Sequence, residues 1–103
     1  MFENARQVVE FARGVSFETY AADSMRRMAV ERGLEVLGEA ARQISASFKA
    51  QHPEIPWRDL VGLRNVLTHD YGEIKQDRIW EIATKDTPEL IRVLRPLVPV
   101  ESD

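Results

Sequence analysis

The chain has 103 residues, a formal net charge of −3, 44% hydrophobic and 30% charged residues, and no cysteine. This length suits a single domain over residues 1–103, and the composition is that of a folded protein rather than a disordered chain. Without cysteine there are no disulfides, no thiolate catalysis and no cysteine-ligated metal, and only two histidines are present, His52 and His69. A histidine-rich metal site is therefore not expected either.

The sequence also argues against a membrane protein and against a general nucleic-acid-coating protein. No apolar run approaches the roughly 20 residues of a membrane span, and the N-terminus has no apolar segment typical of a signal peptide. We therefore expect a cytoplasmic location and no membrane contact. A protein that coats nucleic acid without specificity would be basic, whereas this chain has a sequence pI near 5.4.

Helical periodicity dominates the start of the chain. The apolar spacing predicts a first helix over residues 2–13, which Gly14 ends. Ser16 is placed to cap a short helix over residues 17–22, because its side chain can accept a hydrogen bond from a free amide of the first turn.

The longest helix is predicted to begin at Asp23 or Ser24, either of which can cap it, and to run to about Lys49. Its apolar stripe consists of Val30, Leu34, Leu37, Ala41, Ile44 and Phe48. This spacing is typical of a helix packed lengthwise in a bundle. Gly33 and Gly38 lie inside this helix, where each costs about 1 kcal/mol relative to alanine, and they predict the close approach of a neighbouring helix.

The middle of the chain contains a break and a third helix. Two prolines within residues 52–56 predict the break, and Pro56 suits the first turn of the helix that follows. We expect this helix to end between His69 and Gly72, with Gly72 available as its C-terminal cap. Its apolar stripe consists of Trp57, Leu60, Leu63 and Leu67.

Two further helices are predicted in the last third of the chain. Asp77 is placed to cap a fourth helix. Thr87 and Pro88 form a cap followed by a first-turn proline, which predicts that the last helix restarts there and that Pro96 ends or kinks it. No strand pattern or internal repeat is present, so the predicted fold is an all-α, up-and-down helical bundle.

One short segment carries the residue types needed for chemistry on a phosphodiester. Residues 64–71 read Arg-Asn-Val-Leu-Thr-His-Asp-Tyr. The planar guanidinium of Arg64 is shaped to hold a phosphate, and the imidazole of His69 exchanges protons near neutral pH. Together they can cleave RNA without metal. The histidine would take the proton of the ribose 2′-OH or protonate the leaving oxygen, and the arginine would stabilise charge on the phosphorus-bound oxygens.

Helix geometry limits how these groups can meet. On a straight helix Arg64 and His69 lie about 140° apart, whereas Asn65 and His69 lie about 40° apart and share a face. Arg64 therefore joins His69 by bending its side chain, through a distorted helix end, or in a site that a second subunit completes. Spacing alone favours a structural interpretation, in which Arg64 forms an ion pair at the core edge and His69 lies near a helix C-terminus, where positive charge is stabilised.

The segment from Arg64 to Tyr71 resembles the R-x-x-x-x-H-x-Y motif of HepT-like proteins, which belong to the HEPN superfamily (higher eukaryotes and prokaryotes nucleotide-binding). Other parts resemble the same family in the same order. They are residues 30–41, the segment from His52 to Trp57, and the helix around Ile79 and Trp80. The resemblance extends over residues 16–98.

This resemblance implies a helical bundle that forms a homodimer, with the two motif copies facing a shared cleft. It implies a metal-independent endoribonuclease that needs no cofactor and is the toxin of a type VII-like toxin–antitoxin pair, with a small nucleotidyltransferase as antitoxin. Arg64 and His69 match the catalytic pair, and Asn65 matches the polar residue that assists. Tyr71 matches the tyrosine that the nucleotidyltransferase modifies with AMP.

Three hypotheses of function remain open at this point. The chain is an RNA-cutting enzyme, a module that binds nucleotide or RNA in the same cleft without cutting, or an adaptor that only binds the nucleotidyltransferase. The Arg64/His69 pair favours the enzyme over the adaptor. It does not separate the enzyme from the binding module, because groups that stabilise a transition state also bind a ground-state phosphate. Glu39 is a further candidate for the site, although a solvated or ion-paired glutamate is the expected state.

Aromatic and basic residues elsewhere are expected to have ordinary structural positions. Trp57 and Trp80 have the chemistry to stack on bases but fall at core spacing, so we expect both in the core. Arg26, Arg27 and Arg78 have the charge to guide RNA, but each alone is expected to be a surface cation.

Overall fold

The protein is described by a computed structural model that covers residues 1–69 and 72–97, the side chains of residues 69 and 72–75 excepted. Within these ranges the regular elements are helices and none is a strand, which confirms the predicted all-α bundle. The α-helices are α1 (Phe2–Ala12), α2 (Phe17–Ala22), α3 (Ser24–Arg42), α4 (Ala46–Gln51), α5 (Trp57–Val61), α6 (Leu63–His69), α7 (Gly72–Glu81) and α8 (Thr87–Leu94). A π-helical turn (Ile82–Asp86) joins α7 to α8, and a 3₁₀ turn (Arg95–Leu97) follows α8. In this described part no helix is both long enough and apolar enough to cross a bilayer.

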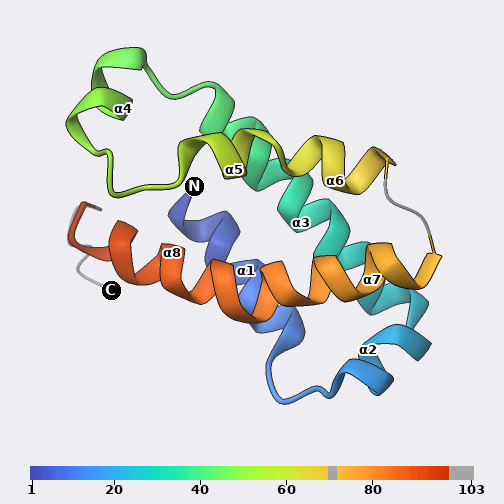
Figure 1. The fold of residues 1–103 in the computed structure, drawn as a ribbon. Coiled ribbons are helices and arrows are strands. Elements are labelled where there is room, and N and C mark those ends of the chain that lie inside the picture. Colours follow the sequence, from blue (N-terminus) through green and yellow to red (C-terminus); the bar gives the residue numbers. More distant parts are fainter. Residues whose placement is uncertain (70–71, 98–103) are drawn as a thin grey trace.

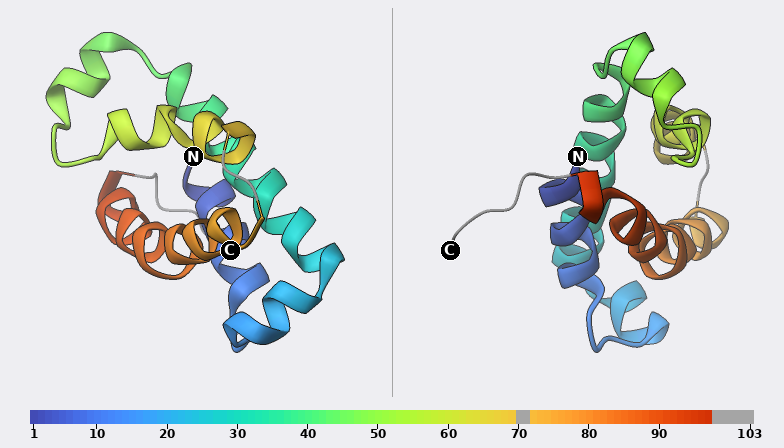
Figure 2. Two further views of the ribbon diagram at one scale, coloured as in Figure 1. Left: turned by 45° about the vertical axis from the view of Figure 1, so that its right-hand side comes forward. Right: turned by 90° about the vertical axis from the view of Figure 1, so that its left-hand side faces the viewer.

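The helices form two layers (Figure 1). α1 and α3 pack against each other in one layer, and the other contains the α5–α6 segment and the α7–α8 segment, which run in opposite directions (Figure 2). α3 contacts α5 and α6, and α1 contacts α8, so the apolar faces of the two layers meet. The bundle is thin, because its Cα atoms extend 40, 33 and 17 Å along the principal axes.

The core between the layers is built from the predicted apolar stripes. It includes Val30, Leu34, Leu37 and Ala41 of α3, Leu60 and Leu63, and Ala5 and Val8 of α1. The two glycines of α3 lie where neighbouring helices come close, as their positions predict. A Cβ atom at Gly33 would lie 2.7 Å from Cγ2 of Val8, and one at Gly38 would lie 2.9 Å from the carbonyl oxygen of Leu60.

The predicted caps hold the corner between α1, α2 and α3. Gly14 follows α1 with a φ of +67°, a conformation that glycine adopts without steric cost. Ser16 accepts a hydrogen bond from the amide of Thr19 at 3.2 Å and begins α2. Asp23 accepts one from the amide of Arg26 at 3.1 Å and begins α3. Both caps confirm the sequence prediction.

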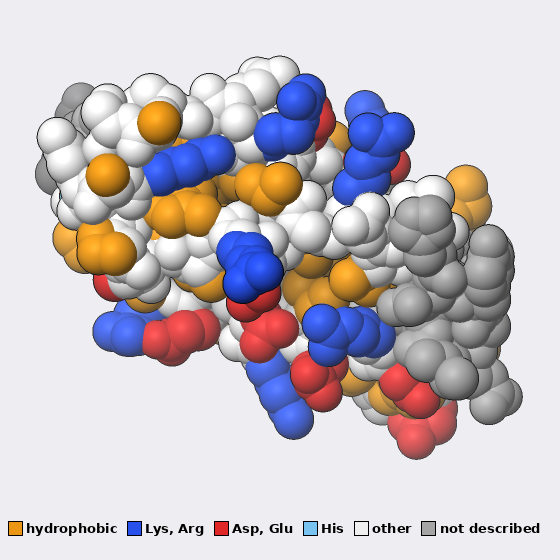
Figure 3. Space-filling model, turned by 45° about the horizontal axis from the view of Figure 1, so that its top comes forward, with side chains coloured by type: hydrophobic (Ala, Val, Ile, Leu, Met, Phe, Trp, Pro, Cys, Tyr) orange, Lys and Arg blue, Asp and Glu red, His pale blue; other side chains and the backbone are white. Residues whose placement is uncertain are grey.

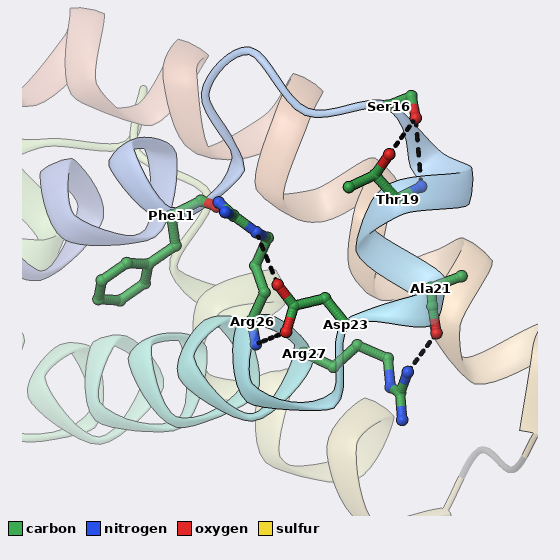
Figure 4. Close-up of polar contacts among 7 residues, drawn as sticks. All are labelled: Phe11, Ser16, Thr19, Ala21, Asp23, Arg26 and Arg27. Atoms are coloured by element: carbon green, nitrogen blue, oxygen red, sulfur yellow. Dashed lines mark hydrogen bonds and ion pairs between the residues drawn. The ribbon is translucent and has the colours of Figure 1, made fainter.

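The prediction that Arg26 and Arg27 are ordinary surface cations is wrong. Both residues are half-buried, and each donates a hydrogen bond to a backbone carbonyl near the end of a helix (Figure 4). Arg26 donates to the carbonyl of Phe11 in α1, and Arg27 donates to that of Ala21 in α2. Carbonyl groups at helix C-termini lack partners within the helix, so these arginines satisfy acceptors that the corner leaves open.

The predicted long helix is wrong in its last part. α3 ends at Arg42, and Ser45 accepts a hydrogen bond from the amide of Phe48 at 3.2 Å to begin the separate helix α4. A serine side chain that caps a new helix competes with continuation of the old one. The apolar spacing continues across this break, because Ile44 and Phe48 are both half-buried. The pattern therefore did not reveal the change of direction.

The predicted third helix is divided in two. α5 and α6 meet at Gly62, whose amide donates to the carbonyl of Arg58 at 3.0 Å. Pro56 precedes α5 instead of lying in its first turn. Gly72 is the first residue of α7 and does not cap α6.

The predicted start of the fourth helix is wrong, whereas the last helix begins at Thr87 as predicted. α7 begins at Gly72, so Asp77 lies inside it. α8 has Pro88 in its first turn, but Asp86 and not Thr87 occupies its N-cap position, and the π-helical turn carries the chain into α8 without a break. Pro88 has no amide hydrogen and its ring would clash with a carbonyl in a regular α-helix, and the wider turn accommodates it. The hydroxyl of Thr87 donates to the carbonyl of Ile82 at 2.8 Å, and the backbone amide of Thr87 donates to the same carbonyl.

Gly38→Ala is expected to lower the free energy of unfolding by about 1–3 kcal/mol, because the new methyl group would crowd a backbone carbonyl of α5. Gly33→Ala is the matched control on the same helix. Its methyl group would lie 2.7 Å from Cγ2 of the buried Val8, and a side chain can shift further than a backbone carbonyl, so its loss should be smaller than that of Gly38→Ala. Urea unfolding followed by circular dichroism measures both variants. Equal losses would contradict this account of the contact between α3 and α5.

Candidate functional site

A groove between α3 and α6 contains the arginine of the candidate motif. Its volume is about 650 Å³. Arg64 and Thr68 of α6 line one wall with Val61 and Leu67, and Arg64 is exposed. The hydroxyl of Thr68 donates to the carbonyl of Arg64, one turn earlier. The opposite wall consists of Arg32, Glu35, Val36, Gly38, Glu39, Ala40, Arg42 and Gln43.

The three arginines of the groove differ in their partners. Arg32 forms an ion pair with Glu35 at 2.5 Å. Arg42 donates two hydrogen bonds to the carboxylate of Glu39, from Nη2 at 2.7 Å and from Nε at 3.2 Å. The guanidinium of Arg64 has no hydrogen-bond or ion-pair partner among the described residues. Its donors are therefore open to an anion that enters the groove.

Glu39 connects the two walls electrostatically. The hydrogen bond from Arg42 lowers the pKa of Glu39, and a hydrogen bond from Gln43 and the charge of Arg64 act in the same direction. The carboxylate is therefore ionised at neutral pH and lies close enough to Arg64 to interact with its charge. This is the ion-paired state expected for Glu39, while its contribution to chemistry stays a prediction.

The other motif residues lie around α6 or beyond it. Asn65 is exposed but does not line the groove that contains Arg64. His69 is the last residue of α6, so the angle of about 140° between positions 64 and 69 applies to this helix. The side chain of His69 and the whole of Tyr71 lie outside the described residues, and their predicted roles stay predictions.

The visible surface carries charges of both signs (Figure 3). Lysine and arginine side chains lie beside acidic ones, with apolar atoms exposed between them. A field of mixed sign does not attract nucleic acid over a broad area. An RNA ligand on this face would therefore depend on local contacts and not on a broad basic area.

The remaining candidates from the sequence have structural positions. Trp57 and Trp80 are half-buried and pack against the core, which confirms the prediction for both. Arg78 is exposed, in agreement with a surface cation. Across residues whose side chains are described, no three or more histidine, aspartate or glutamate residues are grouped so that they could hold a metal ion.

The structure also reveals a polar cluster that the sequence analysis missed. Tyr20 of α2, Gln76 of α7 and Glu31 of α3 are hydrogen-bonded in series. These bonds join residues 56 and 45 positions apart in the chain. No local spacing pattern connects such distant positions, so the sequence alone gave no signal for this cluster.

Comparison with known proteins identifies relatives along most of the chain. The family model described as "Ribonuclease HepT-like" matches residues 1–97. A protein of Thermococcus cleftensis named "Probable ribonuclease HepT" is 39% identical over 83 residues, which cover 81% of this chain and 76% of that protein. A protein of Methanocaldococcus jannaschii named "Putative RNase MJ1380" is 38% identical over 90 residues, which cover 87% of this chain and 83% of that protein. No solved structure is significantly similar to the chain.

These matches agree with the motif and with the all-helical fold. The matched residues 1–97 include both walls of the groove and the whole segment from Arg64 to Tyr71. The chain therefore belongs to the HepT-like ribonuclease family.

Proposed function

We propose that this chain is an endoribonuclease that cuts RNA without a metal ion and acts as the toxin of a type VII-like toxin–antitoxin module. Membership of the HepT-like family supports the ribonuclease role. The finer statements rest on the resemblance of residues 64–71 to the family motif and on the state of Arg64.

The observation that carries the proposal is the open guanidinium of Arg64. The charges of Arg32 and Arg42 are already compensated by carboxylates at 2.5 and 2.7 Å. Arg64 is exposed in the same groove, and the planar fork of its donors matches two oxygens of a phosphodiester. An RNA phosphate in the groove would therefore bind to Arg64 without first breaking an ion pair there.

The proposed reaction is a transesterification within the RNA. The ribose 2′-oxygen attacks the phosphorus, the bond from phosphorus to the 5′-oxygen breaks, and the products carry a 2′,3′-cyclic phosphate and a 5′-hydroxyl. His69 takes the proton of the 2′-OH or gives a proton to the leaving oxygen. Arg64 stabilises the charge on the phosphorus-bound oxygens, and Asn65 assists beside it. Glu39 acts on Arg64 through its charge alone, because its carboxylate is hydrogen-bonded to Arg42 and Gln43.

A second copy of the chain completes the proposed site. Positions 64 and 69 lie about 140° apart around α6, so one subunit alone brings Arg64 and His69 together only with a bent side chain or a distorted helix end. Met25 and Met28 of α3 are 81% and 69% exposed. Residue 28 shares a face of α3 with Arg32 of the groove, one turn later. Adjacent exposed apolar side chains next to a functional groove favour an interface between two copies.

The proposed antitoxin is a small nucleotidyltransferase that attaches AMP to Tyr71. This part rests on the resemblance, in which Tyr71 occupies the modified position. The attached phosphate would bring negative charge and acceptor oxygens to the motif, where Arg64 would pair with it instead of with RNA. The adenosine would also occupy space that the substrate needs.

A module that binds RNA or nucleotide without cutting it is the second candidate. The open guanidinium of Arg64 supports this candidate too, because phosphate binding requires no turnover. An adaptor for the nucleotidyltransferase would need neither Arg64 nor His69. An assay of RNA cleavage separates the enzyme from both alternatives.

The protein is expected to cleave RNA in the presence of EDTA, and to leave a substrate intact when the linkage at the cut site is 2′-deoxy. His69→Ala should lower kcat by about 10²–10⁴-fold through loss of acid–base catalysis. Arg64→Ala should lower kcat by about 10²–10³-fold through loss of charge stabilisation. Gel analysis of a labelled RNA measures these effects.

Arg58→Ala is the matched control for this assay, since Arg58 is exposed on α5 and does not line the Arg64 groove. It should cut RNA at the parent rate. Activity that EDTA abolishes and magnesium restores would contradict the mechanism. Binding of RNA by the parent protein without any cleavage would favour the second candidate.

In solution the protein is expected to have about twice the 11.8 kDa mass of one chain, because two copies share the site. Replacing both Met25 and Met28 with serine should shift it toward the monomer, since these side chains supply exposed apolar area. Leu97→Ser, which changes another exposed apolar residue away from α3, is the control. Light scattering at micromolar concentration makes the measurement. A monomeric parent protein would argue against the shared site.

Incubation with ATP and the proposed nucleotidyltransferase antitoxin is expected to add AMP to Tyr71 and to stop RNA cleavage without unfolding the bundle. Intact-mass measurement and peptide mapping locate the adduct. Tyr71→Phe should escape both modification and inhibition, because it lacks the hydroxyl. Full inhibition of that variant with no adduct would show that the partner inhibits by binding alone.

A further inference from the structure

A hydrogen-bonded chain connects three helices at the start of α7. The phenol of Tyr20 in α2 donates to Oε1 of Gln76 in α7 at 2.7 Å, and Nε2 of Gln76 donates to Oε2 of Glu31 in α3 at 3.4 Å. Tyr20 is fully buried, and Gln76 and Glu31 are half-buried. The three side chains join α2, α3 and α7 at one place in the fold.

The direction of these hydrogen bonds is fixed by the chemistry of Tyr20. Burial, together with the charge of Glu31, raises the pKa of Tyr20 to about 12, although Arg27 acts in the opposite direction. The phenol therefore stays protonated at neutral pH and is a donor to a nearby amide oxygen. Because the amide of Gln76 offers its oxygen to Tyr20, its NH₂ group is left to donate to the carboxylate of Glu31.

Aromatic contacts hold the next turn of α7 to the same helix. The rings of Tyr20 and Trp80 lie 4.7 Å apart between centroids, and the rings of Phe17 and Trp80 lie 6.2 Å apart. Gln76 and Trp80 are one helical turn apart, so α2 contacts two successive turns of α7. The hydrogen bond from Tyr20 to Gln76 is polar and directional. The ring contacts of Trp80 are apolar and fix the position of α7 along its axis less closely.

α6 is anchored separately, because Leu63 is buried against α3 near Gly38. Only residues 70 and 71 separate the end of α6 at His69 from the start of α7 at Gly72. The geometry at His69 therefore depends on how both helices are held. We infer that Tyr20, Gln76 and Glu31 are positioning residues, which fix the start of α7 and thereby the placement of the motif residues that close α6. This inference rests on the proposed ribonuclease function.

The test compares RNA cleavage by Tyr20→Phe with that of the parent protein. Tyr20→Phe keeps the ring that packs on Trp80 and removes the hydroxyl alone. It should lower kcat by about 10- to 100-fold, because a displaced acid–base group loses alignment with the reacting atoms. The KM for RNA should stay unchanged, since Arg64 is held on α6 and still binds phosphate.

A double variant that exchanges the side-chain types of Gln76 and Glu31 tests whether the lost kcat can be restored. Gln76→Glu places a carboxylate beside Glu31 and should lower kcat as Tyr20→Phe does. Adding Glu31→Gln restores a carboxylate for the phenol and an amide donor beside it, and should return kcat toward the parent value. Phe17→Leu is the control, because it weakens the same aromatic packing without touching a hydrogen bond. It should lower the melting temperature and leave kcat unchanged.

Unchanged kcat in both Tyr20→Phe and Gln76→Glu, or an equal loss of kcat in Phe17→Leu, would overturn the inference. Hydrogen exchange supplies a readout that needs no activity: Tyr20→Phe should lose protection at the amides of residues 76–80, which have acceptors within α7, while α1 keeps its own. Uniform loss of protection in both helices would also overturn it. If the parent protein cuts no RNA, the proposed function fails, and hydrogen exchange alone then decides whether the network holds α7.

Discussion

The close contact of α3 with α5 at Gly38 determines the geometry of the candidate site. Because Gly38 has no side chain, α5 lies so close to α3 that a Cβ atom at this position would be 2.9 Å from the carbonyl oxygen of Leu60. Glu39 is the next residue after Gly38 in α3, and only Gly62 separates α5 from α6. The same contact therefore sets the separation between Glu39 and Arg64, which face each other across the groove.

The arginines that line this groove differ in whether a nearby carboxylate compensates their charge. Two arginines are held by glutamates of their own helix, each three residues away, and these pairs are exposed to solvent. Exposed pairs of this kind contribute little to stability, so their main consequence is electrostatic. They compensate the positive charge of α3 and leave Arg64 as the open donor of the opposite wall. A chain of net charge −3 can in this way present the uncompensated guanidinium of Arg64 in this groove.

The sequence predicted the features that depend on neighbouring residues. Ser16 and Asp23 were identified as caps because each side chain acts on an amide three residues later, and the stripe of α3 was identified by its spacing. The breaks at Ser45 and Gly62 were missed because apolar spacing records which face is buried and does not record a change in direction. The π-helical turn was missed because proline usually stops a helix, whereas here the chain passes through the wider turn and into α8 without a break.

The candidate site was predictable only in part, for the same reason. Arg64, Asn65 and His69 lie within one short segment, so a local motif identified them. The network of Tyr20, Gln76 and Glu31 depends on packing between distant helices, which no single-sequence pattern contains. We propose that Arg64 and His69 cut RNA through its 2′-hydroxyl without a metal. Mass analysis of the fragment ends formed in EDTA tests this most directly. The expected ends are a 2′,3′-cyclic phosphate and a 5′-hydroxyl, and fragments with a 3′-hydroxyl and a 5′-phosphate would contradict the proposed mechanism.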